Sequence, residues 1–333
     1  IMEEARNNLS GDLATAGYIL SNFQENLELK VRLIAGSEKI PELMTANDVS
    51  SIRNRLAMLN IENDLDFLSV VDTSAKFVAR AFQIECQGGK LNNSVVNSAL
   101  GGKAAAGFRV IQVEALCEDN PNLYQRLVQS GIKTAMIVES AYPVVHETSI
   151  MTESRVIGAV YGGILVNNNN VLVDRIAKRL FRGQAHEGKD VGFIAIYQGA
   201  SAISSTLRGP DHLPVVGFEL EKSLQRSILN SGQTEVSPQT LFGTDYISAT
   251  EPIRDVTGAI IGALQVSTME RPILSVIDRL VGAFLIIALF GVILMGGISY
   301  VLVNWINRPL EQMLLAAKRA AEGDLTHEVP VVA

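Results

Sequence analysis

The longest apolar stretch of the chain lies near its C-terminal end. Residues 280–303 form a run of 24 residues without a charged side chain, bounded by Asp278 and Arg279 on one side and by Trp305 and Arg308 on the other. At 1.5 Å per residue a helix of this length extends about 36 Å, more than a hydrocarbon core of about 30 Å. A buried core helix of a soluble protein rarely runs this far without a charge. The pattern predicts a transmembrane helix.

A second helical pattern occupies the first residues. Apolar side chains alternate at spacings of three and four, at Leu9, Leu13, Ala16, Leu20, Phe23, Leu27 and Ile34. This spacing predicts a helix of about 35 residues with a coiled-coil seam. Two interpretations stay open: a stalk helix that pairs with its twin in a homodimer, or a helix that packs on its own domain. Tyr18 and Leu33 widen the apolar face beyond a strict seam.

Between these helices the apolar period shortens to that of strands, in two successive series. The first predicts strands at 67–71, 76–82, 134–145 and 155–166, a loop with one short helix at 87–107, and a helix at 171–180. The second predicts strands at 191–197, 202–207, 246–252 and 259–267, with an amphipathic helix at 218–229. The order of elements is therefore repeated, in shorter form.

Two hairpin segments carry a resemblance to a known family. Residues 250–266, which read TEPIRDVTGAIIGALQV, resemble the last two strands of Cache sensor domains, and 141–145 with 156–163 look like an earlier copy. Residues 165–176 are similar to the linker helix that follows a membrane-distal Cache module. The resemblance implies an α+β fold, in which a long N-terminal helix precedes two PAS-like antiparallel-sheet modules.

A second resemblance lies beyond the apolar run. Arg308-Pro309-Leu310 and Gly323-Asp324-Leu325 resemble the first helix and the connector start of a HAMP domain, and Leu310, Met313, Ala317 and Ala320 keep the spacing of one helix in a parallel bundle. Pro309 would suit the first turn of such a helix.

Together, these patterns and resemblances predict how the chain is organised. It comprises a stalk or dimerisation helix and its continuation at 1–60, a membrane-distal Cache module at 61–182, a membrane-proximal module at 183–272, the transmembrane helix at 273–305 and a partial HAMP domain at 306–333.

This organisation implies a bacterial or archaeal receptor in the cytoplasmic membrane, with an extracytoplasmic or periplasmic sensor and a cytoplasmic HAMP domain. The resemblance implies a histidine kinase, a chemotaxis signalling domain or a diguanylate cyclase as the output domain. No residue of the chain distinguishes the three, and we expect a histidine kinase on general frequency. The chain opens at Ile1-Met2-Glu3 without a signal peptide, so we expect an export signal or a first membrane span upstream.

Composition excludes some partners. The formal charge is −7, and Lys and Arg form no dense cluster, which argues against a nucleic-acid partner. The two cysteines, Cys86 and Cys117, could close a disulfide loop in an oxidising compartment, but their spacing fits neither a redox pair nor a zinc site.

No catalytic pattern occurs in the sequence. The four histidines, His146, His186, His212 and His327, are scattered, and neither a triad, an HExxH motif nor a phosphate-binding glycine loop is present. We therefore expect a non-enzymatic chain without a cofactor or a metal.

A small-molecule site is expected in the membrane-distal module, on the concave face of its sheet. The candidate ligand-binding residues are Arg80, Arg109, Tyr142 and Tyr161. Arginine grips a carboxylate with two parallel hydrogen bonds, which favours an organic acid, and tyrosine adds a hydroxyl above an apolar ring. The alternative is structural: surface arginines in salt bridges and core tyrosines with a hydrated tip.

The expected mechanism is a ligand-driven shift between two packings of a dimer, carried through the transmembrane helix. A rival hypothesis from another class is an interaction module that binds a protein partner and has no small-molecule pocket. A third hypothesis is a membrane-tethered enzyme. It would need titratable residues that converge in one cleft, and the sequence offers no candidate set.

Overall fold

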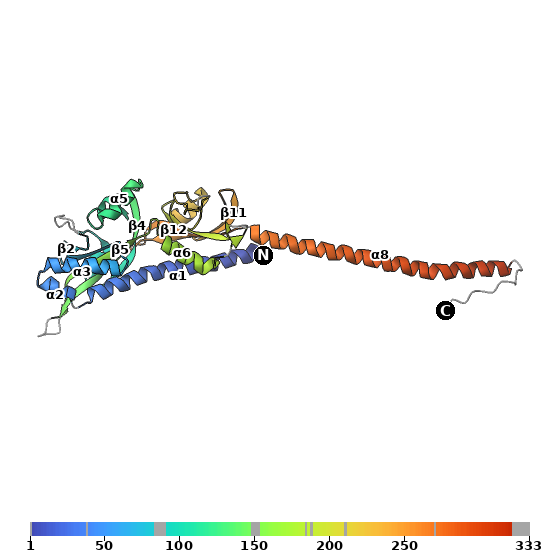
Figure 1. Cartoon of the computed structure of the whole chain (residues 1–333), viewed down its shortest axis with the longest axis horizontal. Coiled ribbons are helices and arrows are strands. Elements are labelled where there is room, and N and C mark those ends of the chain that lie inside the picture. Colours follow the sequence, from blue (N-terminus) through green and yellow to red (C-terminus); the bar gives the residue numbers. More distant parts are fainter. Residues whose placement is uncertain are drawn as a thin grey trace. The chain divides into compact units, whose positions relative to one another are not determined.

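The computed structural model describes residues 2–37, 39–82, 91–147, 154–183, 185–186, 189–209, 212–269 and 271–321. The chain divides into two compact units, Ile1–Glu270 and Arg271–Ala333. The first unit has an N-terminal helix and two five-stranded antiparallel sheets, which confirms the predicted α+β class (Figure 1). In the second unit, the described residues form one helix.

The N-terminal helix α1 (Met2–Ala35) runs along both sheets of the first unit (Figure 1). Its predicted apolar stripe is buried at Leu9, Leu13, Ala16, Leu20, Leu27 and Ile34, with Phe23 partly buried, and Val31 is buried beside it. These side chains share one core with residues of both sheets, such as Val138 and Val266. The stripe therefore packs on its own domain, the second of the two interpretations, and the exposed apolar residues Tyr18 and Leu33 lie outside it.

The first module, the predicted membrane-distal one, contains strands β1–β5. Its elements after α1 are α2 (Lys39–Thr45), α3 (Val49–Glu62), β1 (Phe67–Asp72), β2 (Phe77–Arg80), α4 (Ser94–Leu100), β3 (Ala105–Gln112), the 3₁₀ helix η1 (Val113–Leu116), α5 (Pro121–Gln129), β4 (Thr134–Glu147) and β5 (Ser154–Leu165). The sheet order is β2-β1-β5-β4-β3. The last strand of the module is thus its central strand.

The second module contains strands β8–β12 and has the same topology. It comprises α6 (Asn170–Phe181), the short strands β6 (Ala185–His186) and β7 (Lys189–Asp190), β8 (Gly192–Gln198), β9 (Ser201–Ser205), α7 (Lys222–Leu224), the π turn η2 (Gln225–Asn230), β10 (Glu235–Leu241), β11 (Thr244–Arg254) and β12 (Ile260–Met269). Its order is β10-β11-β12-β8-β9, which is the first sheet's order read from the other edge. The repeat predicted from the sequence is present in the fold.

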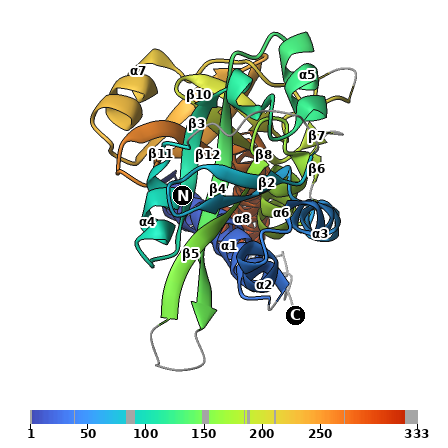
Figure 2. The same ribbon diagram turned by 90° about the vertical axis from the view of Figure 1, so that its left-hand side faces the viewer.

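Each sheet has two buried faces. One face of each joins the shared core under α1, and in the first module α2 and α3 also contribute to it (Figure 2). The opposite face of the first sheet packs against α4, η1 and α5 in a separate core, and that of the second sheet packs against α7 and η2. Successive residues of a strand point to opposite faces of the sheet. Neighbouring residues of a strand therefore pack into different cores.

Four elements illustrate where the structure differs from the sequence-based expectation. Strand β3 begins at Ala105, inside the stretch expected to be a loop, although the short helix expected there is present as α4. Helix α5 was not predicted, although Asn120 caps it and Pro121 occupies its first turn. The helix expected at 218–229 begins only at Lys222, and β10 was missed because it is an edge strand that contains Pro238.

The second unit is the helix α8 (Arg271–Ala321). Its segment Val281–Arg308 contains an 18-residue window with a mean hydropathy of 2.6 and is long and apolar enough to cross a membrane, which agrees with the predicted span. The helix continues through Pro309, which therefore lies inside a helix rather than in its first turn and removes one backbone hydrogen bond. The Gly323-Asp324-Leu325 motif lies outside the described residues, and the HAMP domain stays a prediction.

Candidate ligand-binding site

A pocket of about 390 Å³ opens in the first module, on the face of the sheet opposite α1. Its apolar lining comes from strands, from η1 and from the segment before α4, namely Phe67, Phe77, Leu91, Ile111, Leu116 and Ile137. Its polar lining includes Arg80, Arg109, Tyr161, Glu114, Glu118 and Asp119. Three of the four residues predicted to bind a ligand are therefore brought together here.

Antiparallel pairing aligns the groups at one end of this pocket. Arg109 in β3 pairs with Ile137 in β4, and Tyr161 in β5 pairs with Ala141 in β4 and with Ser69 in β1. Because alternate residues face the same side of a sheet, Glu139, between Ile137 and Ala141, also faces this side. Glu139 is fully buried.

Glu139 is the centre of a hydrogen-bonded network. Its Oε2 accepts hydrogen bonds from Arg109 Nε at 2.9 Å, from Tyr161 Oη at 2.9 Å and from Asn93 Nδ2 at 3.0 Å. Arg109 Nη2 lies 2.8 Å from the same oxygen and donates to Tyr161 Oη at 3.0 Å. Glu139 Oε1 has no hydrogen-bond partner among the described residues. The carboxylate thus holds Arg109 and Tyr161 in place.

The electrostatics of the network agree with this arrangement. Burial, and then the charge of Glu139, raise the pKa of Tyr161 well above its ordinary value, so the phenol stays protonated and can donate. Burial would lower the pKa of Arg109, but Tyr161 and Glu139 more than offset this effect and raise it. Arg109 therefore remains a cation with its carboxylate partner behind it.

Arg80 also lines the pocket, and it is likewise paired with carboxylates. Its Nε donates to Asp119 Oδ1 at 3.1 Å, and its Nη2 donates to Glu118 Oε2 at 2.6 Å. The guanidinium carbon lies 3.6 Å from the ring centroid of Phe77, a cation–π contact. Burial raises the pKa of Asp119, although the charge of Arg80 opposes that shift. Ser69 Oγ donates to the same Asp119 oxygen at 3.2 Å.

Tyr142 does not line the pocket. It lies on the opposite face of β4, where it packs against the shared core, and Arg32 of α1 lies 5.9 Å from its ring centroid. Because successive residues of a strand point to opposite faces, Tyr142 and Glu139, which are three residues apart, lie on opposite sides of the sheet. Of the four predicted residues, Tyr142 is the one that belongs to the interface with α1.

The sequence analysis missed Glu139, Asn93, Glu118 and Asp119. Glu139 had a detectable signal, because it is the one acidic residue in the apolar stretch from 135 to 145, which contains no Lys, Arg or His. A charge in a strand that is buried on both faces needs a partner and so points to a functional or structural network. Asn93 and Asp119 precede helices and resemble ordinary capping or turn residues.

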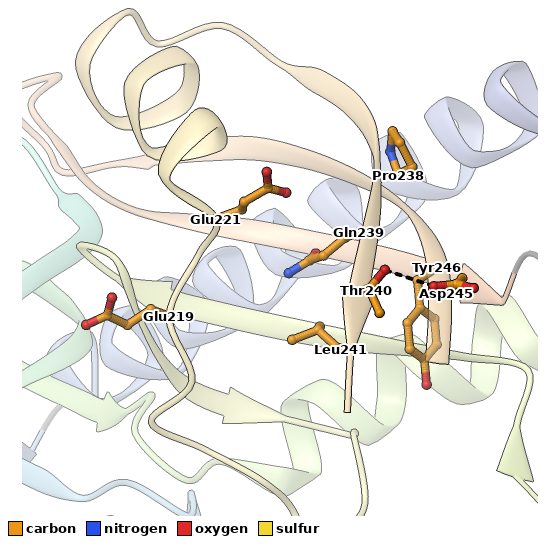
Figure 3. A pocket seen from close by; sticks show the side chains of 8 residues that line it. All are labelled: Glu219, Glu221, Pro238, Gln239, Thr240, Leu241, Asp245 and Tyr246. Carbon is orange, nitrogen blue, oxygen red and sulfur yellow. Dashed lines mark hydrogen bonds between the residues drawn. The ribbon is translucent and has the colours of Figure 1, made fainter. Parts of the chain in front are cut away.

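The second module has two further pockets. One, of about 490 Å³, is a surface depression lined by Glu219, Glu221, Pro238, Gln239, Thr240, Leu241, Asp245 and Tyr246; Thr240 Oγ1 donates to Asp245 Oδ1 at 2.8 Å (Figure 3). The other, of about 640 Å³, is lined by residues that include Phe193, Tyr246 and Met269, with Arg208 and His212. The Nη2 atom of Arg208 lies 3.7 Å from Oδ1 of Asp174. Neither has a buried ionic network like that of Glu139.

The described residues contain no group of three or more His, Cys, Asp or Glu side chains placed to hold a metal ion. Cys86 lies outside the described residues, so the predicted disulfide with Cys117 stays a prediction.

Residues 164–280 match the family model described as Single cache domain 3. The match begins at the end of β5, includes the second module and ends in α8. It confirms the predicted resemblance to Cache sensor domains for that part of the chain. No curated protein sequence matches the chain significantly.

Solved structures similar in fold are sensor domains. The periplasmic domain of Vibrio cholerae LuxQ is 12% identical, with a TM-score of 0.45, over 79% of this chain and 99% of that one. The sensor domain of the V. cholerae histidine kinase DctB is 12% identical, with a TM-score of 0.40, over 80% and 96%. The sensory domain of the Campylobacter jejuni chemoreceptor Tlp3 with isoleucine bound is 9% identical, with a TM-score of 0.46, over 81% and 92%.

Proposed function

We propose that this chain is the sensor and membrane-spanning part of a prokaryotic signal-transducing receptor. In this proposal Ile1–Glu270 is extracytoplasmic, the apolar segment of α8 crosses the cytoplasmic membrane, and the residues beyond it begin a cytoplasmic HAMP domain that leads to a histidine kinase. The alternative output domains, a chemotaxis signalling domain or a diguanylate cyclase, would receive the same signal from the sensor. The combination of a pocketed PAS-like module with an apolar helix directly after the second module supports this proposal.

The first-module pocket is the proposed ligand site. It has the volume of a small-molecule site, apolar walls and a few polar groups whose positions are fixed by buried partners. A ligand that binds one packing of the receptor tenfold better than the other supplies about 1.4 kcal/mol of coupling, within the usual range for allosteric proteins.

The test is calorimetric titration of the chain in lipid nanodiscs against amines, amino acids, carboxylates and purines. We expect at least one solute to bind with saturable heat and to raise the melting temperature. The matched variant is Ile137→Trp. Ile137 is buried and lines the pocket, so the larger tryptophan side chain would fill the pocket. If no solute binds, the rival hypothesis of a protein-interaction module gains support.

We further propose that the receptor is a homodimer formed through α1. Tyr18, Leu29 and Leu33 of α1 are 68%, 51% and 66% exposed, on a surface that the helix does not use for its own core. Leu33→Glu should therefore convert dimers to monomers without changing the melting temperature of the monomer. Val171→Glu, at a 70% exposed site on α6, is the control. Light scattering of both variants distinguishes the outcomes, and an unchanged dimer in Leu33→Glu contradicts the proposal.

A further inference from the structure

The first-module pocket contains more carboxylates than cations. Among the described residues, Glu114, Glu118 and Asp119 line it and Glu139 lies behind Arg109, whereas Arg80 and Arg109 are its two cationic side chains. Four carboxylates against two guanidiniums leave an excess of two negative charges when all are ionised.

Both arginines are already engaged. Arg109 lies 2.8 Å from the fully buried Glu139, and Arg80 is held between Glu118 and Asp119. A carboxylate ligand that took Arg109 would compete with Glu139, and separating that pair would leave a buried carboxylate without its cation. Such uncompensated buried charge is strongly unfavourable. The arginines therefore act as structural counterions.

The excess negative charge is at accessible positions. Glu114 is exposed, and the side chain of Glu118, which shares the single charge of Arg80 with Asp119, is 41% exposed, whereas that of Arg80 is 9% exposed. The lining of the pocket thus combines accessible carboxylates with the apolar side chains of Leu91, Ile111 and Ile137. Accessible carboxylates in a pocket attract a cation and repel an anion.

We propose that the ligand of this pocket is a small organic cation, with an ammonium group at Glu114 and Glu118 and an apolar body against Ile111 and Ile137. This inference rests on the proposed ligand-sensing function and replaces an organic acid with an amine-bearing solute. An ammonium group supplies hydrogen-bond donors to carboxylate oxygens, and charge-assisted bonds of this kind are the stronger ones.

The experiment uses triplets of solutes that share one apolar body and differ in charge, such as 3-methylbutylamine, leucine and 4-methylpentanoate. Each is titrated calorimetrically into the chain in nanodiscs made of zwitterionic lipid, at low and high salt. We expect the amine to bind about tenfold or more tightly than the matched carboxylate. We also expect its affinity to fall as salt screens the exposed acids.

The double variant Glu114→Gln/Glu118→Gln locates the effect. It keeps side-chain size and leaves Asp119 to hold Arg80, and it should weaken amine binding about tenfold. Glu62→Gln, at an exposed site of α3 outside the pocket, is the matched control and should bind like the parent.

The outcomes separate the two proposals. Carboxylates that bind as tightly as their matched amines, or amine affinity unchanged in the double variant, would overturn the cation proposal while ligand sensing stands. Failure of every triplet and of every other solute to bind would overturn both.

Discussion

Phe108 in β3 of the first module forms a parallel bridge with Asp255, in the turn that joins β11 and β12 of the second module. Gly107 lies directly under Val256 of the same turn, and Gln198 Nε2 of β8 donates to Thr134 Oγ1 of β4 at 2.6 Å. The residue after Phe108 is Arg109, which lines the pocket. The turn of the β11–β12 hairpin thus lies beside the strand that carries Arg109, and β12 ends at Met269, two residues before α8 begins.

The contact between Gly107 and Val256 gives the first prediction. A methyl group at Gly107 would overlap Cγ1 of Val256, so Gly107→Ala should lower the free energy of unfolding by about 1–3 kcal/mol. Adding Val256→Ala removes the overlapping methyl group and should restore most of the loss. Chemical denaturation of both variants measures the coupling. Gly11→Ala, where a methyl group meets nothing, is the control and should not destabilise.

The second prediction concerns Arg109 and Glu139. Arg109→Met leaves a fully buried carboxylate without its cation and should destabilise the chain by about 3–5 kcal/mol. Glu139→Gln should cost less, because the Arg109 side chain is 29% exposed and can be hydrated. The double variant should recover stability relative to Arg109→Met. Additive losses in a denaturation cycle would contradict a direct interaction.

The third prediction is a pH dependence at Glu251 of β11, whose carboxylate lies against α1 at Gly17. Burial raises the pKa of Glu251 above its ordinary value of 4.5. The folded state therefore binds this proton more tightly than the unfolded state. The stabilisation is complete below 4.5 and is lost as the pH rises through the raised pKa. Relative to Glu251→Gln, the parent should become less stable from pH 4 to pH 7, and a constant difference in unfolding free energy would refute this.

The fourth prediction concerns membrane insertion of α8. A charge at the centre of a membrane span costs about 2.5–3.5 kcal/mol on insertion scales. Val292→Asp lies within the apolar segment and should shift the chain from the membrane fraction to the soluble or degraded fraction. Leu314→Asp, beyond that segment, is the control and should insert normally. Equal membrane fractions for both variants would argue against a span at this position.

Much of the fold could be predicted from the sequence because its elements have strong periodicity. The stripe of α1 and the long strands β4 and β5 are examples. Strand β3 was missed because it begins Ala105-Ala106-Gly107, where small side chains leave room for Val256 and give little apolar contrast. Such a strand is defined by its neighbours rather than by its own composition.

The site was only partly predictable, for a geometric reason. Residue type, with strand position for Arg80 and Tyr161, selected Arg80, Arg109 and Tyr161, although the strand that carries Arg109 was missed. Tyr142 satisfied the same criteria but lies on the α1 side of β4, because the strand alternates its faces. Both faces of this sheet are buried, so the sequence does not mark which one carries the pocket. The pairing of each arginine with carboxylates depends on contacts between distant strands and loops.

The burial of α1 against both sheets has a consequence for engineering this chain as the proposed receptor. Leu9 and Leu13 near the start of the helix, and Val31 and Ile34 near its end, complete one core that extends through both modules. Cutting the chain between the modules would leave one of them without its share of the helix and would uncover apolar surface. Chimaeras that exchange sensing specificity should therefore transplant the whole of Ile1–Glu270 as one cassette, with the fusion point in α8.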